Sequence, residues 1–95
     1  MQNKLDKDSL AYLYEALLTL ETPGQCEIFL DDLCTIQELK ALSQRMQVAK
    51  MLSEQNVYSD IVAQTGASTA TISRVNRCLH YGRDGYKYVL EKLEK

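Results

Sequence analysis

Apolar residues recur at three- and four-residue steps along most of this chain, the spacing of one face of an α-helix. The first such segment carries its apolar residues from Leu10 to Leu18, and capping oxygens at its start are offered by Asp6, Asp8 and Ser9. Thr22-Pro23-Gly24 is predicted to end this helix, because proline cannot continue the hydrogen-bond ladder. A short second helix is predicted over residues 28–33. No β-type alternation appears, so the pattern predicts an all-α protein.

The third predicted helix is apolar on more than one side. It begins at Thr35, which with Glu38 forms a capping-box pattern, and runs to about Glu54. A helix that is apolar on two sides is buried on two sides, and a second subunit is a natural source of that cover. We therefore expect a homodimer, with other helices of the same chain as the alternative. The apolar residues are Leu39, Leu42, Met46 and Ala49 in one stripe, widened by Val48, Met51 and Leu52.

Two short helices joined at a glycine are predicted between residues 58 and 79. Gly66 stands where the chain leaves the first helix, a position that favours a left-handed residue. Ser68 is a suitable N-cap for the second helix. This arrangement fits a helix-turn-helix, which places its second helix in the DNA major groove. The residues expected to face inward are Ile61, Val62 and Thr65 on the first helix and Ile72, Val75 and Leu79 on the second.

The outer face of the second helix combines small, hydroxylated and basic residues. Small side chains near a helix N-terminus can approach base edges, and arginines further along suit phosphate or guanine. Taken singly, capping serines and solvated arginines account for each residue; the combination indicates a DNA-reading surface. The residues expected to contact DNA are Ser68, Thr69, Ala70, Ser73, Arg74, Arg77 and His80.

Charge is distributed unevenly along the 95 residues, which are expected to form one domain. Residues 1–60 contain ten acids against five bases, and residues 61–95 contain six bases against three acids. No acidic residue lies between Ile61 and Arg83. The net charge of −2 is unusual for a nucleic-acid binder, but the predicted reading helix lies at the electropositive end. A loop over residues 81–85 and a last helix with Tyr86, Val89, Leu90 and Leu93 on one face complete the chain.

Several function classes find no support in the sequence. No apolar run approaches the roughly 20 residues that a membrane-spanning helix needs. Cys26, Cys34 and Cys78 lack zinc-ligand spacing, so we expect reduced thiols, a cytoplasmic protein and no metal or other cofactor. A single histidine and no paired carboxylates argue against an enzyme. The main alternative to a DNA-binding regulator is a helical module whose helix-turn-helix contacts protein instead of DNA.

Two segments of the chain resemble the Trp repressor superfamily, in particular its YerC/YecD-type TrpR-like branch. These are Thr35 through Arg45 and the run Gly66-Ala67-Ser68-Thr69-Ala70-Thr71-Ile72-Ser73-Arg74, within a similarity over about residues 28–93. The resemblance implies a six-helix fold, an intertwined homodimer and binding of double-stranded operator DNA through two helix-turn-helix units. Several basic residues that tryptophan-dependent members carry on the first helix of the motif are absent here. That region contains Tyr58, Ser59 and Val62 instead.

The resemblance also implies an effector pocket, which this sequence retains only in part. Thr35, Arg45, Thr71 and Arg74 match pocket positions of the family, but Val75 stands where tryptophan-binding members have glycine. Cys78 replaces the serine that helps to hold the ligand's amino group, and a thiol is a poor hydrogen-bond partner. A branched side chain in the space for the indole ring excludes that ring sterically. We therefore predict a repressor that does not use L-tryptophan as its effector.

Overall fold

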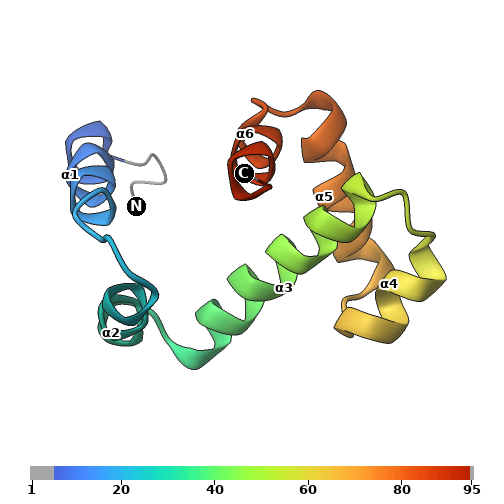
Figure 1. Ribbon diagram of the computed structural model, residues 1–95, viewed down its shortest axis with the longest axis horizontal. Coiled ribbons are helices and arrows are strands. Elements are labelled where there is room, and N and C mark those ends of the chain that lie inside the picture. Colours follow the sequence, from blue (N-terminus) through green and yellow to red (C-terminus); the bar gives the residue numbers. More distant parts are fainter. Residues whose placement is uncertain (1–5, 95) are drawn as a thin grey trace. The chain divides into compact units, whose positions relative to one another are not determined.

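Six α-helices account for most of residues 6–94, the part of the chain that the computed structural model describes (Figure 1). No β-strand occurs within that range, which confirms the predicted all-α class. Among the described helices, none combines the length and apolar character needed to cross a membrane. The chain falls into two compact units, one ending at Ile36 and one beginning at Gln37, and single-domain organisation stays a prediction. The helices are α1 (Lys7–Leu17), α2 (Pro23–Leu33), α3 (Ile36–Ser53), α4 (Tyr58–Thr65), α5 (Thr69–Tyr81) and α6 (Gly85–Leu93).

The first helix, α1, begins at a side-chain cap. The Asp6 carboxylate accepts a hydrogen bond from the Ser9 hydroxyl over 2.7 Å and one from the Asp8 main-chain N–H over 3.2 Å. These bonds favour the charged carboxylate and hold the pKa of Asp6 below its ordinary value. The expectation that Asp6 caps this helix is therefore confirmed.

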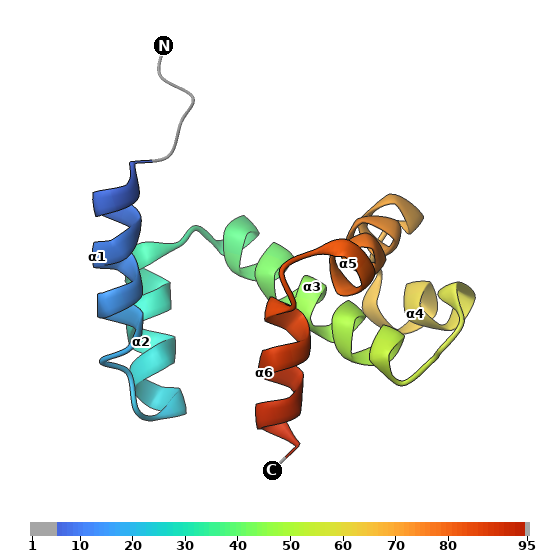
Figure 2. The same ribbon diagram turned by 90° about the horizontal axis from the view of Figure 1, so that it is seen from above.

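Thr22, Pro23 and Gly24 open α2 and do not end α1, which corrects the prediction from sequence. The first helix already ends at Leu17. The Thr22 hydroxyl accepts from the Gln25 N–H over 3.1 Å, and the Gln25 side-chain oxygen accepts from the Thr22 N–H over 3.3 Å. Pro23 suits the first helical position because no intrahelical bond is needed from its nitrogen. As a result, α2 covers Pro23–Leu33 and not only residues 28–33 (Figure 2).

Neither α1 nor α2 contains a buried residue. Helices of this length are marginal in water on their own and depend on packing of an apolar face. By itself, this unit therefore does not enclose its apolar side chains in a core. The large apolar side chains exposed here are Tyr12, Tyr14, Leu17, Leu18, Ile28 and Leu33.

The second unit encloses the buried core. Helices α4 and α5 lie against the C-terminal half of α3 (Figures 1 and 2), and side chains from all three meet between them. Burying an Ile or Val side chain contributes about 1.5–3 kcal/mol relative to leaving it exposed. The predicted inward positions Ile61, Ile72, Val75 and Leu79 are confirmed. The buried side chains are Val48, Ala49, Ile61, Ala67, Ile72, Val75 and Leu79.

Several predicted core positions are only partly covered, and Val62 and Leu42 are exposed. Val62 is 37% exposed, because it follows Ile61 by one residue and the short α4 buries only the Ile61 face. Leu42 on α3 is 46% exposed, although Val48 and Ala49 further along the same helix are fully buried. The apolar surface of α3 is therefore wider than the core of this unit, as its sequence pattern indicates.

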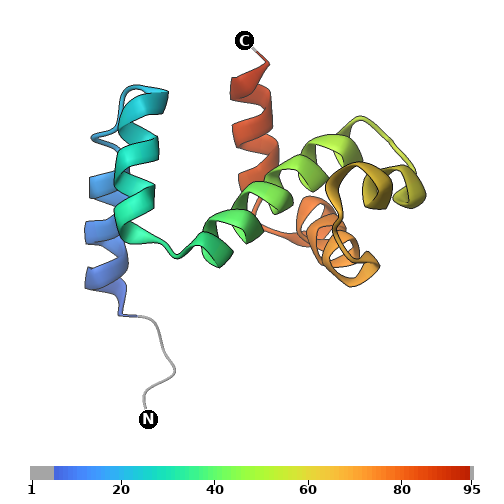
Figure 3. The same cartoon turned by 90° about the horizontal axis from the view of Figure 1, so that it is seen from below.

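The connection between α5 and α6 is shorter than predicted. Tyr81 belongs to α5 and Gly85 opens α6, so only residues 82–84 lie outside a helix (Figure 3). At Gly82 an added Cβ would lie 2.4 Å from the Cys78 carbonyl oxygen, so a side chain there collides with the end of α5. Asp84 follows with a φ of 64°, in the left-handed region. The loop thus turns the chain sharply directly after Tyr81.

Candidate nucleic-acid interface

The turn between α4 and α5 has the local chemistry that its sequence predicts. Gly66 adopts a φ of 73°, and its N–H donates to the Val62 carbonyl over 2.9 Å. The Ser68 hydroxyl oxygen accepts from the Thr71 N–H over 3.1 Å and so caps α5. Both predicted roles are confirmed. Ala67 lies between them and is buried, a core position that the sequence reasoning missed.

Thr65 fixes the end of α4. Its hydroxyl donates to the Ile61 carbonyl over 2.7 Å and accepts from the Ala67 N–H over 3.1 Å. Its main-chain carbonyl accepts a bond from the Gln44 side-chain amide on α3 over 3.1 Å. The last carbonyls of a helix have no partner within it, so Gln44 satisfies one of these groups. The turn, and with it the start of α5, is thereby tied to α3.

The outer face of α5 is exposed and basic. Ser68, Thr69, Ala70, Ser73, Arg74, Arg77 and His80 are all exposed, as predicted for residues that contact DNA. Ile72, Val75 and Leu79 occupy the opposite face. Because α5 is anchored by its buried face, by Ser68 and by the turn, it presents the exposed residues on a fixed support. Such a helix can enter a groove about 12 Å wide.

The structure adds one residue to this face. Tyr81 is the last residue of α5 and is 87% exposed. It follows Arg77 by four residues and Ala70 by eleven, close to whole numbers of helical turns, so all three share one face. The sequence prediction placed Tyr81 in a loop. Tyr81 joins this face because α5 ends at Tyr81 and not before it. In the sequence, Gly82 is the residue that indicates this end of the helix.

One flank of α5 carries the residues matched to an effector pocket. Thr71, Arg74 and Cys78 follow one another at three- and four-residue steps on α5, so they share this side. The Thr71 hydroxyl oxygen accepts a bond from the Ser68 hydroxyl over 3.1 Å, which commits it to the helix cap. Arg45 on α3 is half-buried. Thr35 precedes α3 in the unit that ends at Ile36, so its place in a pocket stays a prediction.

Val75 and Cys78 differ in what surrounds them. Val75 is 2% exposed and packs in the core of its own chain with Ile72 and Leu79. Cys78 lines an apolar cavity of about 570 Å³ between α3, α5 and α6. The residues around this cavity are Met46, Cys78, Gly82, Arg83, Gly85, Tyr86 and Val89.

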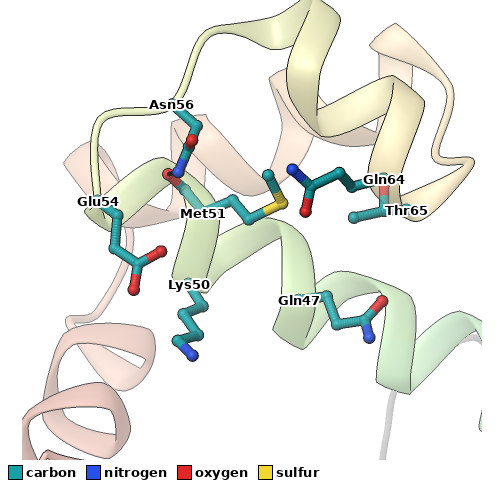
Figure 4. Close-up of a pocket in the computed structure, with 7 residues that line it drawn as sticks. All are labelled: Gln47, Lys50, Met51, Glu54, Asn56, Gln64 and Thr65. Carbon is teal, nitrogen blue, oxygen red and sulfur yellow. Dashed lines mark hydrogen bonds between the residues drawn. The ribbon is translucent and has the colours of Figure 1, made fainter.

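A second concavity lies between α3, α4 and their connection (Figure 4). Its volume is about 380 Å³, and the Asn56 side-chain amide beside it donates to the Met51 carbonyl over 3.0 Å. None of the residues predicted to contact DNA or an effector lines it. The lining residues are Gln47, Lys50, Met51, Glu54, Asn56, Gln64 and Thr65.

Known proteins resemble this chain over nearly its whole length. The family model described as Trp repressor protein matches residues 8–94. Protein YerC of Bacillus subtilis (strain 168), whose function is uncharacterized, is 48% identical over 93 residues, which cover 98% of this chain and 89% of YerC.

Two solved structures share the fold. The crystal structure of a candidate Trp repressor from Staphylococcus aureus superposes with a TM-score of 0.91 at 48% sequence identity. The match covers 99% of this chain and 95% of the S. aureus chain. The crystal structure of a TrpR-like protein from Eubacterium eligens ATCC 27750 superposes with a TM-score of 0.91 at 52% sequence identity. The match covers 98% of this chain and 96% of the E. eligens chain.

Proposed function

The chain belongs to the Trp repressor family, and on that premise we propose that it is a sequence-specific DNA-binding transcriptional regulator that acts as a homodimer. The observation that carries the proposal is the outer face of α5. Ala70, Ser73, Arg74 and Arg77 are exposed on a helix whose opposite face is buried. No acidic side chain lies between Ile61 and Arg83 to repel phosphate.

The roles of these residues follow from their positions along α5. In a helix-turn-helix, residues in the N-terminal part of the second helix contact base edges. Ala70 and Ser73 lie there, so a methyl and a hydroxyl are offered to the bases. Arg77 lies one turn further along and carries a positive charge that suits phosphate. Ser73 and Ala70 thus select the sequence, and Arg77 supplies affinity for any duplex.

Two features support a homodimer. The helices α1 and α2 have no buried residue, and apolar side chains such as Ile28 and Leu33 are exposed on them. Leu42 leaves part of the apolar surface of α3 uncovered as well. A second copy of the chain provides equal and complementary apolar surface. A two-fold dimer of this kind presents two α5 helices about one DNA turn apart and reads a palindromic operator.

The regulator does not use L-tryptophan as its co-repressor. Val75 occupies the position of the family's glycine, and it belongs to the buried core, so it cannot move aside without disturbing Ile72 and Leu79. Cys78 offers a weak hydrogen-bond partner in place of a serine hydroxyl. Repression is the mode of action that the family favours, and α5 is the element that reads the operator.

Binding of purified protein to sheared genomic DNA at several salt concentrations tests the proposal. Because phosphate contacts release counterions, the affinity of a regulator falls steeply as salt rises. We expect Arg77→Ala to weaken binding to all fragments and to reduce the salt slope by about two, one for each subunit of the dimer. Lys40→Ala is the matched control, since it also removes one exposed positive charge but lies on α3 outside the helix-turn-helix.

Sequence selection is tested separately. Ser73→Ala is expected to change which fragments are enriched while total affinity stays close to that of the unchanged protein. Sedimentation at several protein concentrations gives the oligomeric state. A protein that captures no fragment in a salt-sensitive way does not act through DNA, and the helix-turn-helix then serves as a scaffold for contacts with other proteins.

A further inference from the structure

We propose that Tyr81 contacts the DNA backbone at the far end of the reading helix, with its phenolic hydroxyl donating to a phosphate oxygen. This inference rests on the proposed function and extends the interface beyond the residues that read bases. Tyr81 is the last residue of α5 and is 87% exposed. It shares the outer face with Ala70 and Arg77, so it points in the direction that the reading surface faces.

The length of α5 places this side chain beyond the base edges. A helix of 13 residues is about 20 Å long, whereas the major groove is about 12 Å wide. In a complex where α5 crosses the groove with Ala70 and Ser73 at the bases, its last turn lies beside the sugar–phosphate backbone. Phosphate oxygens only accept hydrogen bonds, and the tyrosine hydroxyl is among the side-chain groups that donate to them.

The neighbouring histidine does not offer the same bond. His80 Nδ1 lies 2.9 Å from the Asn76 carbonyl oxygen, and because a carbonyl only accepts, Nδ1 carries the hydrogen. That ring nitrogen is therefore occupied within α5 and is not free to donate to a phosphate. At this end of α5 the neutral donor that faces outward is the Tyr81 hydroxyl.

The chain also leaves the helix in a way that keeps Tyr81 clear. The Gly82 N–H donates to the Cys78 carbonyl over 2.9 Å, and any side chain at Gly82 would collide with that oxygen. The next residue, Arg83, turns toward the cavity lined by Met46 and Cys78. The outer face of α5 therefore ends on the tyrosine ring, and the loop does not cover it.

Tyr81→Phe tests the proposal, because it removes only the hydroxyl and keeps the ring. Tyr88→Phe is the matched control, because Tyr88 is also an exposed tyrosine and lies on α6. Its ring makes a cation–π contact with the Lys92 ammonium, which phenylalanine keeps. Binding to a labelled mixed-sequence duplex of about 30 base pairs, long enough for two half-sites, is followed by fluorescence anisotropy over a range of salt.

We expect Tyr81→Phe to weaken binding about tenfold for each α5 helix that loses its bond to a charged phosphate, and so about a hundredfold for a dimer bound through both helices. The salt slope should stay unchanged, because a hydroxyl releases no counterion, and this separates Tyr81 from Arg77. Equal affinity of Tyr81→Phe and the unchanged protein overturns the inference, and so does an equal loss in Tyr88→Phe. A changed oligomeric state of Tyr81→Phe in sedimentation also overturns it, since Tyr81 then belongs to a subunit contact.

The two proposals fail in different ways. If the unchanged protein shows no salt-sensitive binding to duplex, both the proposed function and the role of Tyr81 are wrong. If it binds and Arg77→Ala weakens binding while Tyr81→Phe does not, the proposed function stands and only the Tyr81 contact is refuted.

Discussion

The side-chain amide of Gln44 on α3 donates a hydrogen bond to the main-chain carbonyl of Thr65, the last residue of α4, over 3.1 Å. Thr65 also bonds to Ile61 and Ala67 through its hydroxyl. A single residue thus connects α3, the end of α4 and the turn that leads to α5. The direction in which α5 leaves the turn depends on this connection.

Replacing Gln44 with leucine should destabilise the fold by about 1–2 kcal/mol, because the half-buried Thr65 carbonyl loses its partner. The free energy of unfolding in urea measures the effect. Gln47→Leu is the control, since Gln47 is an exposed glutamine one turn further along α3. Equal stability of the two variants would show that the Gln44 bond contributes nothing.

Gly66→Ala should cost about 1–2 kcal/mol, because alanine is strained at a φ of 73°. An added Cβ at Gly66 meets no atom within 4 Å, so the cost comes from the backbone alone. Gly85→Ala serves as the control, because Gly85 is helical and an added Cβ there also meets no atom within 4 Å. This variant should raise the free energy of unfolding by up to about 1 kcal/mol. Thermal unfolding measures both variants. If both melting temperatures moved in the same direction, the cost at Gly66 would not come from its left-handed backbone.

Two serines of the motif should separate stability from recognition. Ser68→Ala removes the cap of α5 and is expected to lower the free energy of unfolding by about 1 kcal/mol. Ser73→Ala lies on the exposed face inside the helix, where alanine is favoured, so stability should hold or rise by a few tenths of a kcal/mol. Chemical denaturation compares them. A larger loss in Ser73→Ala than in Ser68→Ala would refute the role of the cap.

L-Tryptophan should neither bind nor stabilise the protein, because the family resemblance places buried Val75 at the position of a glycine and Cys78 at that of a serine. Isothermal titration is expected to show no heat of binding, and the melting temperature should not move with added tryptophan. Ligands that bind the native state raise its melting temperature, so the two readouts check each other. Micromolar binding in the titration would sink this prediction.

Acid should loosen the start of α1. The pKa of Asp6 lies below its ordinary value of 3.8 because the Ser9 hydroxyl and then the Asp8 N–H donate to its carboxylate. A lowered folded-state pKa contributes stability that is present above the unfolded value and is lost as the pH falls through the folded value. Measured against the intrinsic exchange rate at each pH, the protection of amides in the first turn of α1 should therefore fall below about pH 4.

Asp6→Asn is the control for this effect. Asparagine also caps helices and does not titrate in this range. The protection of amides in the first turn of α1 should therefore change less with pH in Asp6→Asn than in the unchanged protein. Equal acid loosening in the unchanged protein and in Asp6→Asn would assign the effect to other groups.

The parts of the fold that depend on neighbouring residues could be predicted from the sequence. The spacing of Ile72, Val75 and Leu79 defines the buried face of α5, and the αL position of Gly66 and the cap at Ser68 follow from short-range chemistry. The same short-range reasoning misassigned Thr22-Pro23, because proline both ends helices and occupies their first turn. Gln25 settles that choice, since its side chain completes a cap that exists only if a helix follows.

Features that depend on distant residues could not be predicted in this way. Gln44 and Thr65 are 21 positions apart, and an amide that bonds to a main-chain carbonyl leaves no pattern of residue types. Val62 looks as apolar as Ile61, and only the direction of α3 decides which of them is covered. Tyr81 joins the reading face because α5 continues one residue into the expected loop.

Every buried side chain among residues 6–94 lies between Val48 and Leu79, and none lies in α1 or α2. The stretch that contains α5 therefore supplies its own interior, while the apolar side chains of the first third of the chain belong to no core of that part. Substitutions on the outer face of α5 therefore change exposed chemistry without touching a side chain of the core, so this helix can accept new surface residues at little cost in stability.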